Sequence, residues 1–296
     1  MTPSRRDGAR RYSGEVHNHS VITFACPDRA GIVHAVSGAI VAVDGNITES
    51  QQYCSPDTGQ FFMRVTVESQ ADASALRGGL EPVAERFGGT VQVDEWGRPV
   101  RTLVLASMAT HCVEGLFSRM RTGTLPITVP LVLANHPDLA PLAEFYGVPF
   151  EHHAVLPETK ASIENRIRAV VAQNDIELVV LARYMQILSP ELCEFLDGRA
   201  INIHHSFLPG FKGANPYRQA HERGVKLIGA TAHFVTADLD EGPIIDQAVA
   251  RVDHSRSVEA LRDIGRDIEA SVLTRAVTLF AEHRLLRDGL RTVVFD

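Results

Sequence analysis

The stretch LVVLARYMQILSPELCEFLDGRAINIHHS, residues 178–206, indicates the fold class of this chain. It begins with an apolar run, Leu178–Ala182, and ends with a second apolar segment around Ile201 and Ile203. Residues 191–196, between the two, are expected to form a helix. Two apolar strands joined through a helix are typical of a parallel α/β sheet.

The same alternation of strands and helices continues on both sides of this stretch. Strands are expected at residues 101–107, 129–134, 178–182, 200–204 and 228–235. Helices are expected at residues 112–121, 138–146, 160–173, 191–196, 215–223 and 257–282. Residues 98–296 are therefore expected to form a Rossmann-like α/β domain with a mostly parallel sheet.

Residues 18–97 have a different pattern and are expected to form a separate domain. Strands are predicted at Ser20–Ala25, Asn46–Tyr53, Gln60–Val67 and Thr90–Glu95, and helices at Ile32–Val43 and residues 71–87. This β-α-β-β-α-β order is the ferredoxin-like arrangement. The turn at Trp96–Pro99 marks the expected boundary. Residues 1–17 contain four arginines and no apolar segment, which predicts a disordered tail rather than a secretory signal.

Composition excludes several classes of function. The 296 residues carry a formal charge of −7, so the chain lacks the basic surface that nucleic acid requires. No run approaches eighteen apolar residues, so a membrane-spanning helix is not expected. The four cysteines form no CxxC pair or zinc-site spacing, which indicates free thiols in the cytoplasm and no metal site. Adjacent histidines, as in His204-His205, face opposite sides of a strand, so they do not suggest a metal site either.

Polar side chains interrupt the apolar strand at 200–204. Asn202 and His204 lie two residues apart, so both project from the same face of the strand. They precede a Ser/Pro/Gly exit, at the end of the sheet where α/β proteins place their sites. Such a pair either satisfies backbone groups of the following loop or supplies an amide and an imidazole for chemistry.

A second strand with an acidic loop follows, in the segment GATAHFVTADLDEGP, residues 229–243. The loop can bring Asp238, Asp240 or Glu241 to the same end of the sheet; alternatively it is a solvated acidic loop. An amide, an imidazole and a carboxylate together suit attack on a carbonyl group. The amide donates to an oxyanion, the imidazole moves a proton, and the carboxylate orients the imidazole or a water.

Three separated motifs resemble the folate-dependent formyltransferase family: Asn202-Ile-His204, Ser206-x-Leu208-Pro209, and Asp240 within HFVTADLDEGPI. The resemblance implies that Asn202, His204 and Asp240 are catalytic. It also implies a folate-binding wall at Tyr184, Met185, Gln186, Ile187 and Leu188. It implies no cofactor, because 10-formyltetrahydrofolate is the substrate.

The N-terminal domain resembles an ACT domain in CPDRAGIVHAVSGAI, residues 26–40, and GNITES, residues 45–50. An ACT domain ahead of a formyltransferase-like domain resembles the formyltetrahydrofolate deformylase family, over about residues 18–296. The resemblance implies hydrolysis of 10-formyltetrahydrofolate to tetrahydrofolate and formate, with formate supply for purine biosynthesis. It also implies a homo-oligomer and an amino-acid effector. The effector site would be Asp28, Arg29, Ala30 and Gly31, unless this is an ordinary turn.

One departure bears on the acceptor of the formyl group. Glycinamide ribonucleotide formyltransferases hold the substrate phosphate on a glycine-rich turn, whereas here the loop is Ala106-Ser-Met-Ala-Thr-His-Cys112, without glycine. Ser107 and His111 remain candidates for binding an anion. Water as the acceptor explains the missing glycines. The alternatives are transfer to a small amine, or an amino-acid sensor without catalysis.

Overall fold

The computed structural model describes residues 18–208 and 216–296 of the chain. The tail predicted at 1–17 lies outside the described residues, as does Pro209–Asn215, which includes one residue of the second sequence motif. The chain divides into two compact units. The N-terminal unit ends at Trp96 and does not include residues 55–58. The second unit consists of Gly97–Asp296 together with those four residues.

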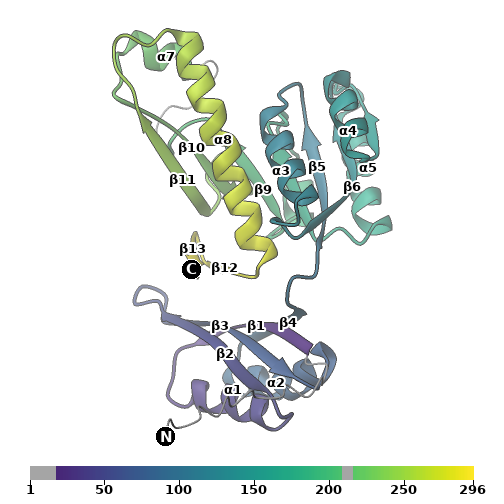
Figure 1. Ribbon diagram of the computed structural model, residues 1–296, viewed down its shortest axis with the longest axis vertical. Coiled ribbons are helices and arrows are strands. Elements are labelled where there is room, and N and C mark those ends of the chain that lie inside the picture. The colour runs from purple at the N-terminus through teal and green to yellow at the C-terminus, as the bar shows by residue number, and fades with distance from the viewer. Residues whose placement is uncertain (1–17, 209–215) are drawn as a thin grey trace, which may run out of the picture. The chain divides into compact units, whose positions relative to one another are not determined.

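The N-terminal unit contains a four-stranded antiparallel sheet with strand order β2-β3-β1-β4 (Figure 1). Its elements are β1 (Asn18–Pro27), α1 (Ile32–Val41), β2 (Asn46–Cys54), β3 (Gln60–Ser69), α2 (Ala73–Phe87) and β4 (Thr90–Glu95). The predicted β-α-β-β-α-β order is therefore present. Its assignment as an ACT domain stays a prediction.

The apolar periodicity of these elements explains their packing. Every second residue of β1, at Ile22, Phe24 and Cys26, enters one apolar core. Residues four apart on each helix enter the same core, because they lie on one helix face; they are Ile32, Val36 and Ile40 on α1, and Leu76, Leu80 and Ala84 on α2.

The second unit is built on a seven-stranded sheet with strand order β11-β10-β9-β8-β5-β6-β7. Its strands are β5 (Val100–Ala106), β6 (Ile127–Ala134), β7 (Phe150–His152), β8 (Leu178–Ala182), β9 (Ala200–His204), β10 (Leu227–Phe234) and β11 (Ile244–Arg251). The helical segments are α3 (His111–Arg121), η1 (Pro137–Leu139), α4 (Ala140–Tyr146), α5 (Lys160–Gln173), α6 (Pro190–Phe195), α7 (Pro216–Glu222) and α8 (Val258–Ala281). A hairpin of β12 (Leu285–Asp288) and β13 (Arg291–Val294) follows.

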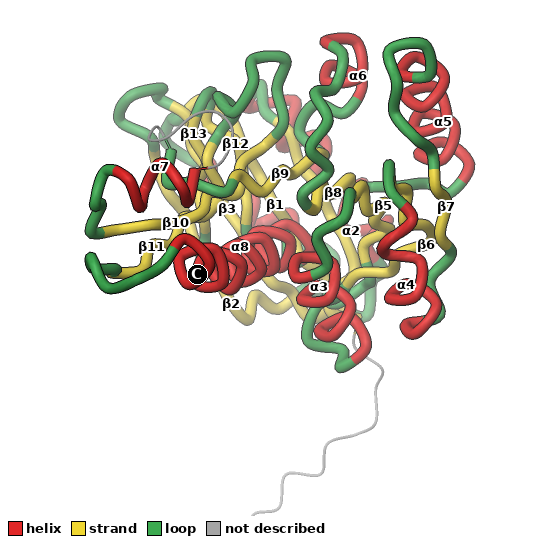
Figure 2. The backbone as a smooth tube through the Cα atoms, turned by 90° about the horizontal axis from the view of Figure 1, so that it is seen from above, coloured by secondary structure: helices red, strands yellow, loops and turns green. Residues whose placement is uncertain are grey.

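Helices cover both faces of this sheet, which makes its central strands apolar on both sides. Val104 and Val180 pack into a core with α3 and α8. Leu105 and Leu181 face the other way, into a core with α5 and α6. Figure 2 shows α5 and α6 on the opposite side of the sheet from α3 and α8.

The sheet is mostly parallel, as expected, but the pairing beyond β9, toward the β11 edge, is antiparallel. β5, β6, β7, β8 and β9 pair in parallel, whereas β10 runs antiparallel to both β9 and β11. The sequence patterns did not predict β7, β11, β12 or β13. Among the helices in the described part of the chain, none combines the length and hydrophobicity needed to cross a membrane.

Candidate active site

A cavity of about 240 Å³ opens where β8 and β9 end, and the loop after β10 closes one side of it. The three residues predicted to be catalytic, Asn202, His204 and Asp240, all line this cavity. The structure therefore brings together side chains from β9 and from the acidic loop. The position agrees with the general rule for sites in α/β sheets.

The pairing of β9 with β10 fixes the environment of Asn202. Its partner across the strands is His233, and Asn202 Nδ2 lies 3.2 Å from His233 Nε2. An amide nitrogen only donates, so the ring nitrogen accepts. The other ring nitrogen, Nδ1, lies 2.8 Å from the Phe234 carbonyl and donates to it. One N–H of the Asn202 amide is thereby bound, which fixes the direction of the second.

The Asp240 carboxylate faces the His204 imidazole at the cavity. Asp240 Oδ2 lies 3.2 Å from His204 Nδ1, and its other oxygen lies 3.6 Å from His233 Nε2. Burial raises the pKa of Asp240, but the interactions that lower it, of which the hydrogen bond with His204 is the largest, together outweigh burial, so its pKa is held well below the usual range. His204 Nε2 is buried and has no hydrogen-bond partner among the described residues.

His233 is a site residue that the sequence analysis did not single out. It lies inside an apolar strand, directly opposite Asn202, and is 3% exposed. The signal was available in the sequence, since a histidine interrupts the apolar strand GATAHF just as Asn202 and His204 interrupt β9.

The predicted folate wall, Tyr184 to Leu188, lines the same cavity. Tyr184 and Leu188 are buried, whereas the apolar side chains of Met185 and Ile187 are 61% and 62% exposed. Ser107 Oγ donates to the Tyr184 carbonyl at 2.6 Å, which ties this segment to the end of β5.

The loop between β5 and α3 uses its polar side chains inside the protein. Ser107 Oγ lies 2.5 Å from Asn135 Oδ1 as well as 2.6 Å from the Tyr184 carbonyl. His111 Nε2 lies 2.8 Å from a carboxylate oxygen of Glu269. Both side chains that were candidates for binding an anion therefore already have protein partners.

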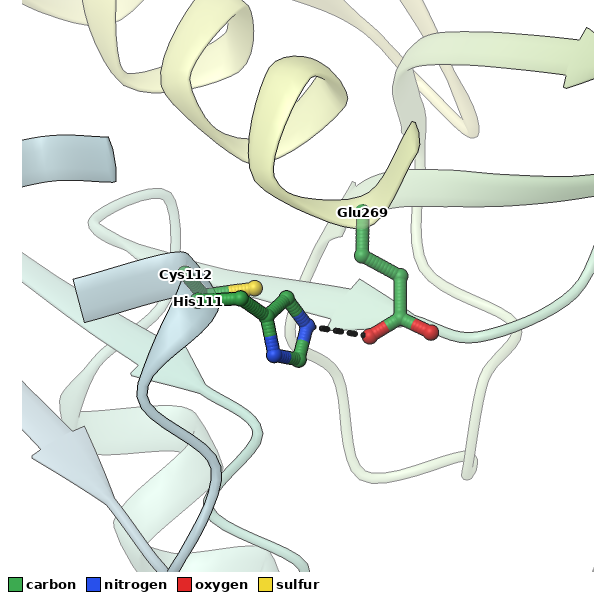
Figure 3. Close-up of side chains that lie close together, drawn as sticks. All are labelled: His111, Cys112 and Glu269. Atoms are coloured by element: carbon green, nitrogen blue, oxygen red, sulfur yellow. Dashed lines mark hydrogen bonds and ion pairs between the residues drawn. The ribbon is translucent and has the colours of Figure 1, made fainter. Parts of the chain in front are cut away.

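One cluster in the described residues has the composition of a metal site. Atoms of His111, Cys112 and Glu269 lie within 4.8 Å of one another (Figure 3). However, Glu269 also accepts from Tyr217 Oη at 2.5 Å and pairs with Arg183 Nη1 at 3.5 Å. Burial and Glu269 raise the pKa of the Cys112 thiol, and only a thiolate is a good metal ligand. The donor set suits a hydrogen-bonded network better than a cation.

The predicted effector segment, Asp28 to Gly31, forms the turn before α1. Gly31 has φ 95° and caps the helix without a side-chain bond. The Asp28 carboxylate accepts from Cys54 Sγ at 3.2 Å, and the Arg29 guanidinium donates to the Arg86 carbonyl. An effector role for these residues stays a prediction.

Comparison with known proteins agrees with this fold. The formyl transferase family model matches residues 100–277, which contain Asn202, His204 and Asp240. This match, together with the α/β sheet, defines the second unit as a formyl transferase domain.

Relatives that match nearly the whole chain narrow the family. A formyltetrahydrofolate deformylase of Corynebacterium sp. (strain P-1) is 46% identical over 93% of this chain and 97% of that protein. The crystal structure of a formyltetrahydrofolate deformylase from Burkholderia mallei has a TM-score of 0.91 and 47% identity, covering 94% of this chain and all of that one. A glycinamide ribonucleotide transformylase from Symbiobacterium toebii matches 68% of this chain and 97% of its own, with a TM-score of 0.62 and 33% identity. The chain belongs to the formyltetrahydrofolate deformylase family.

Proposed function

We propose that this chain hydrolyses 10-formyltetrahydrofolate to tetrahydrofolate and formate in the cavity lined by Asn202, His204 and Asp240. Family membership supports the reaction. The observation that supports the site is the orientation of His204. Its Nδ1 faces the Asp240 carboxylate, while its Nε2 is unpartnered among the described residues.

Asp240 gives His204 the tautomer that the reaction needs. A carboxylate that stays ionised accepts a hydrogen bond from the Nδ1–H group, so the Nε2 of neutral His204 carries a lone pair. Nε2 then takes a proton from the attacking water and returns it to N10 as the C–N bond breaks. The water oxygen joins the formyl carbon, N10 leaves with a proton, and formic acid ionises to formate.

Asn202 stabilises the tetrahedral oxyanion. One N–H of its amide is bound to His233, so the other can donate to the formyl oxygen. His233 thus acts through Asn202 and positions it. The exposed apolar side chains of Met185 and Ile187 offer a surface for the flat pterin ring.

Water is the proposed acceptor because the loop that would bind an acceptor phosphate is otherwise engaged. It lacks glycine, and its polar side chains Ser107 and His111 have protein partners. A transferase would need a separate acceptor site near His204.

Kinetics of single variants test the assignment. Asn202→Ala is expected to lower kcat/KM for formate release about 10²–10³-fold, and His204→Ala about 10²–10⁴-fold. The control is His254→Ala, an exposed histidine outside the cavity, which should match the unaltered chain. Unchanged formate release by a folded His204→Ala variant would reject the mechanism.

The N-terminal unit is a candidate for ligand binding and for association between chains. We propose that this unit is an ACT domain that binds an amino acid such as glycine or methionine, and that the edge strands β2 and β4 favour a homo-oligomer. Calorimetric titration with glycine and with methionine tests the proposed amino-acid binding. Absence of binding heat with both amino acids would reject it. The reaction is placed in the cytoplasm, where the formate supplies purine biosynthesis.

A further inference from the structure

The cavity has a cationic residue that the proposed mechanism does not use. Arg183 directly follows β8 and lines the cavity together with Asn202, His204 and Asp240. Its backbone has φ 63°, in the left-handed region that non-glycine residues rarely adopt. Met185 and Asp240, which line the same cavity, also have positive φ, at 56° and 57°. Unusual backbone conformations of this kind gather at functional sites.

Glu269 pairs with the Arg183 guanidinium. Arg183 Nη1 lies 3.5 Å from Glu269 Oε2, and Glu269 itself is 1% exposed. The carboxylate also accepts from His111 Nε2 and from Tyr217 Oη, so α3, α7 and α8 together fix it (Figure 3 shows the His111 contact). Burial raises the pKa of Glu269, but His111, Arg183 and Tyr217 lower it more, and the carboxylate remains ionised.

Among the described residues, the Nε atom of Arg183 lacks an acceptor, and Nη1 has only the 3.5 Å ion pair with Glu269. Its Nε and Nη1 atoms are buried and make no hydrogen bond within residues 18–208 and 216–296. His204 Nε2 is the third such atom among the cavity-lining residues. Buried donors without acceptors are unusual, and a bound ion or water is the usual explanation. A cation with an unpartnered donor, in a residue that lines the cavity, is suited to a small anion with oxygen acceptors.

We propose that Arg183 is a specificity-determining residue that binds the product formate in the cavity that it lines together with His204. The inference rests on the proposed hydrolysis, which produces formate at the carbon beside His204. A fixed cation at this wall favours the carboxylate of the product and disfavours protonated amines as acceptors. His205 does not add a competing charge, because burial, Arg183 and His204 lower its pKa to about 4.

Formate binding to the complete chain tests this proposal. Sodium formate is titrated at constant ionic strength into protein saturated with tetrahydrofolate, and binding is followed by NMR of ¹³C-labelled formate, which needs no turnover. Arg183→Met is expected to raise the Kd of formate about tenfold or more, as loss of a charge-assisted hydrogen bond implies. The formate Kd of Arg183→Lys should lie between those of Arg183→Met and the unaltered chain. Formamide, which is similar in size but neutral, should bind at least tenfold more weakly than formate.

Two further variants make the result decisive. Arg199→Met is the matched control, because this arginine packs over Phe195 and does not line the cavity, and its formate Kd should be unchanged. Arg183→Met leaves the buried Glu269 without its cation, so the double variant Arg183→Met/Glu269→Gln repeats the test if the single variant fails to fold. An unchanged formate Kd in a folded Arg183 variant, or equal binding of formamide and formate, would overturn the proposal.

The same experiment separates this proposal from the reaction on which it rests. If formate binding depends on Arg183 but 10-formyltetrahydrofolate is not hydrolysed, the proposed function fails and the formate site stands. If hydrolysis occurs but formate binding does not depend on Arg183, the role of Arg183 is rejected and the proposed function stands.

Discussion

Asn202 has its orientation fixed by a neighbour rather than by the backbone alone. Its amide donates to His233 Nε2, and His233 is itself fixed by the Phe234 carbonyl. A side chain that must donate to a short-lived oxyanion needs this kind of support, because small displacements of a catalytic group are costly.

Replacing His233 tests this support. His233→Leu removes the acceptor for the Asn202 amide, so kcat is expected to fall about 10–10²-fold with little change in KM. His233→Gln keeps an acceptor oxygen and should retain more of the activity. Steady-state kinetics of the two variants check the prediction; equal kcat values for Leu and Gln would contradict it.

Asp240 couples the site to the stability of the chain. Its folded pKa is lower than the value of about 3.9 expected when unfolded, so its contribution to stability is present above about pH 4 and lost as the pH falls further. Asp240→Asn is expected to lower the free energy of unfolding by about 1–3 kcal/mol at neutral pH. Denaturant titrations from pH 7 to 3 measure the difference, which should narrow below about pH 4. A constant difference over this range would contradict the prediction.

Among the elements, α7 and α8 meet at a position where only glycine fits. A Cβ atom built on Gly265 of α8 would lie 2.1 Å from Tyr217 Oη. The missing side chain lets Tyr217 lie against α8 and donate to Glu269, one turn further along. Gly265 thus supports the network that holds Arg183.

The effect of Gly265→Ala on the free energy of unfolding is expected to have opposite signs in the unaltered chain and in a Tyr217→Ala variant. In the unaltered chain it should destabilise by about 1–3 kcal/mol, because the Tyr217 ring must move. In a Tyr217→Ala background the conflict is absent, and alanine should stabilise the helix by up to about 1 kcal/mol. Urea unfolding of the four proteins measures both effects, and an equal cost in the two backgrounds would contradict the packing described.

The elements that the sequence did not predict lack a strong periodic signal. β7 has only three residues, and β11, IIDQAVAR, shows no regular alternation of apolar and polar residues and directly follows the acidic site loop. In contrast, β8 has five successive apolar residues because helices cover both of its faces, and it was predicted to the residue.

At the scale of the whole molecule, each unit has an apolar core of its own. The core of the N-terminal unit uses residues between 22 and 93, and the cores of the second unit use residues between 100 and 294. The site follows the same division, since every residue lining the cavity lies between Leu181 and Asp240.

This division predicts that residues 98–296 fold without the N-terminal unit. We expect the fragment to unfold cooperatively and to release formate from 10-formyltetrahydrofolate at a rate within about tenfold of the full chain. Thermal unfolding followed by near-ultraviolet circular dichroism, together with a formate assay, checks both parts. A fragment without a cooperative transition would show that its cores depend on residues before 98.

Sequence reasoning reached Asn202, His204 and Asp240 because their residue types break an apolar pattern at strand ends and match a family motif. It missed Arg183, although this arginine lies beside the predicted folate wall. Its importance depends on Glu269, which is 86 positions away (269 − 183) and contributes no local pattern. Contacts between side chains so distant in the sequence appear only once the fold brings α8 against the end of β8.

In the proposed reaction, water activated at Asp240 and His204 takes the formyl group. The most direct test is formate release from 10-formyltetrahydrofolate in H₂¹⁸O without any amine acceptor, comparing the unaltered chain with Asp240→Ala. We expect formate that carries one oxygen from the labelled water, and loss of formate release in the variant. Release of formate that is equally fast in a folded Asp240→Ala variant, or formate without the label, would contradict it.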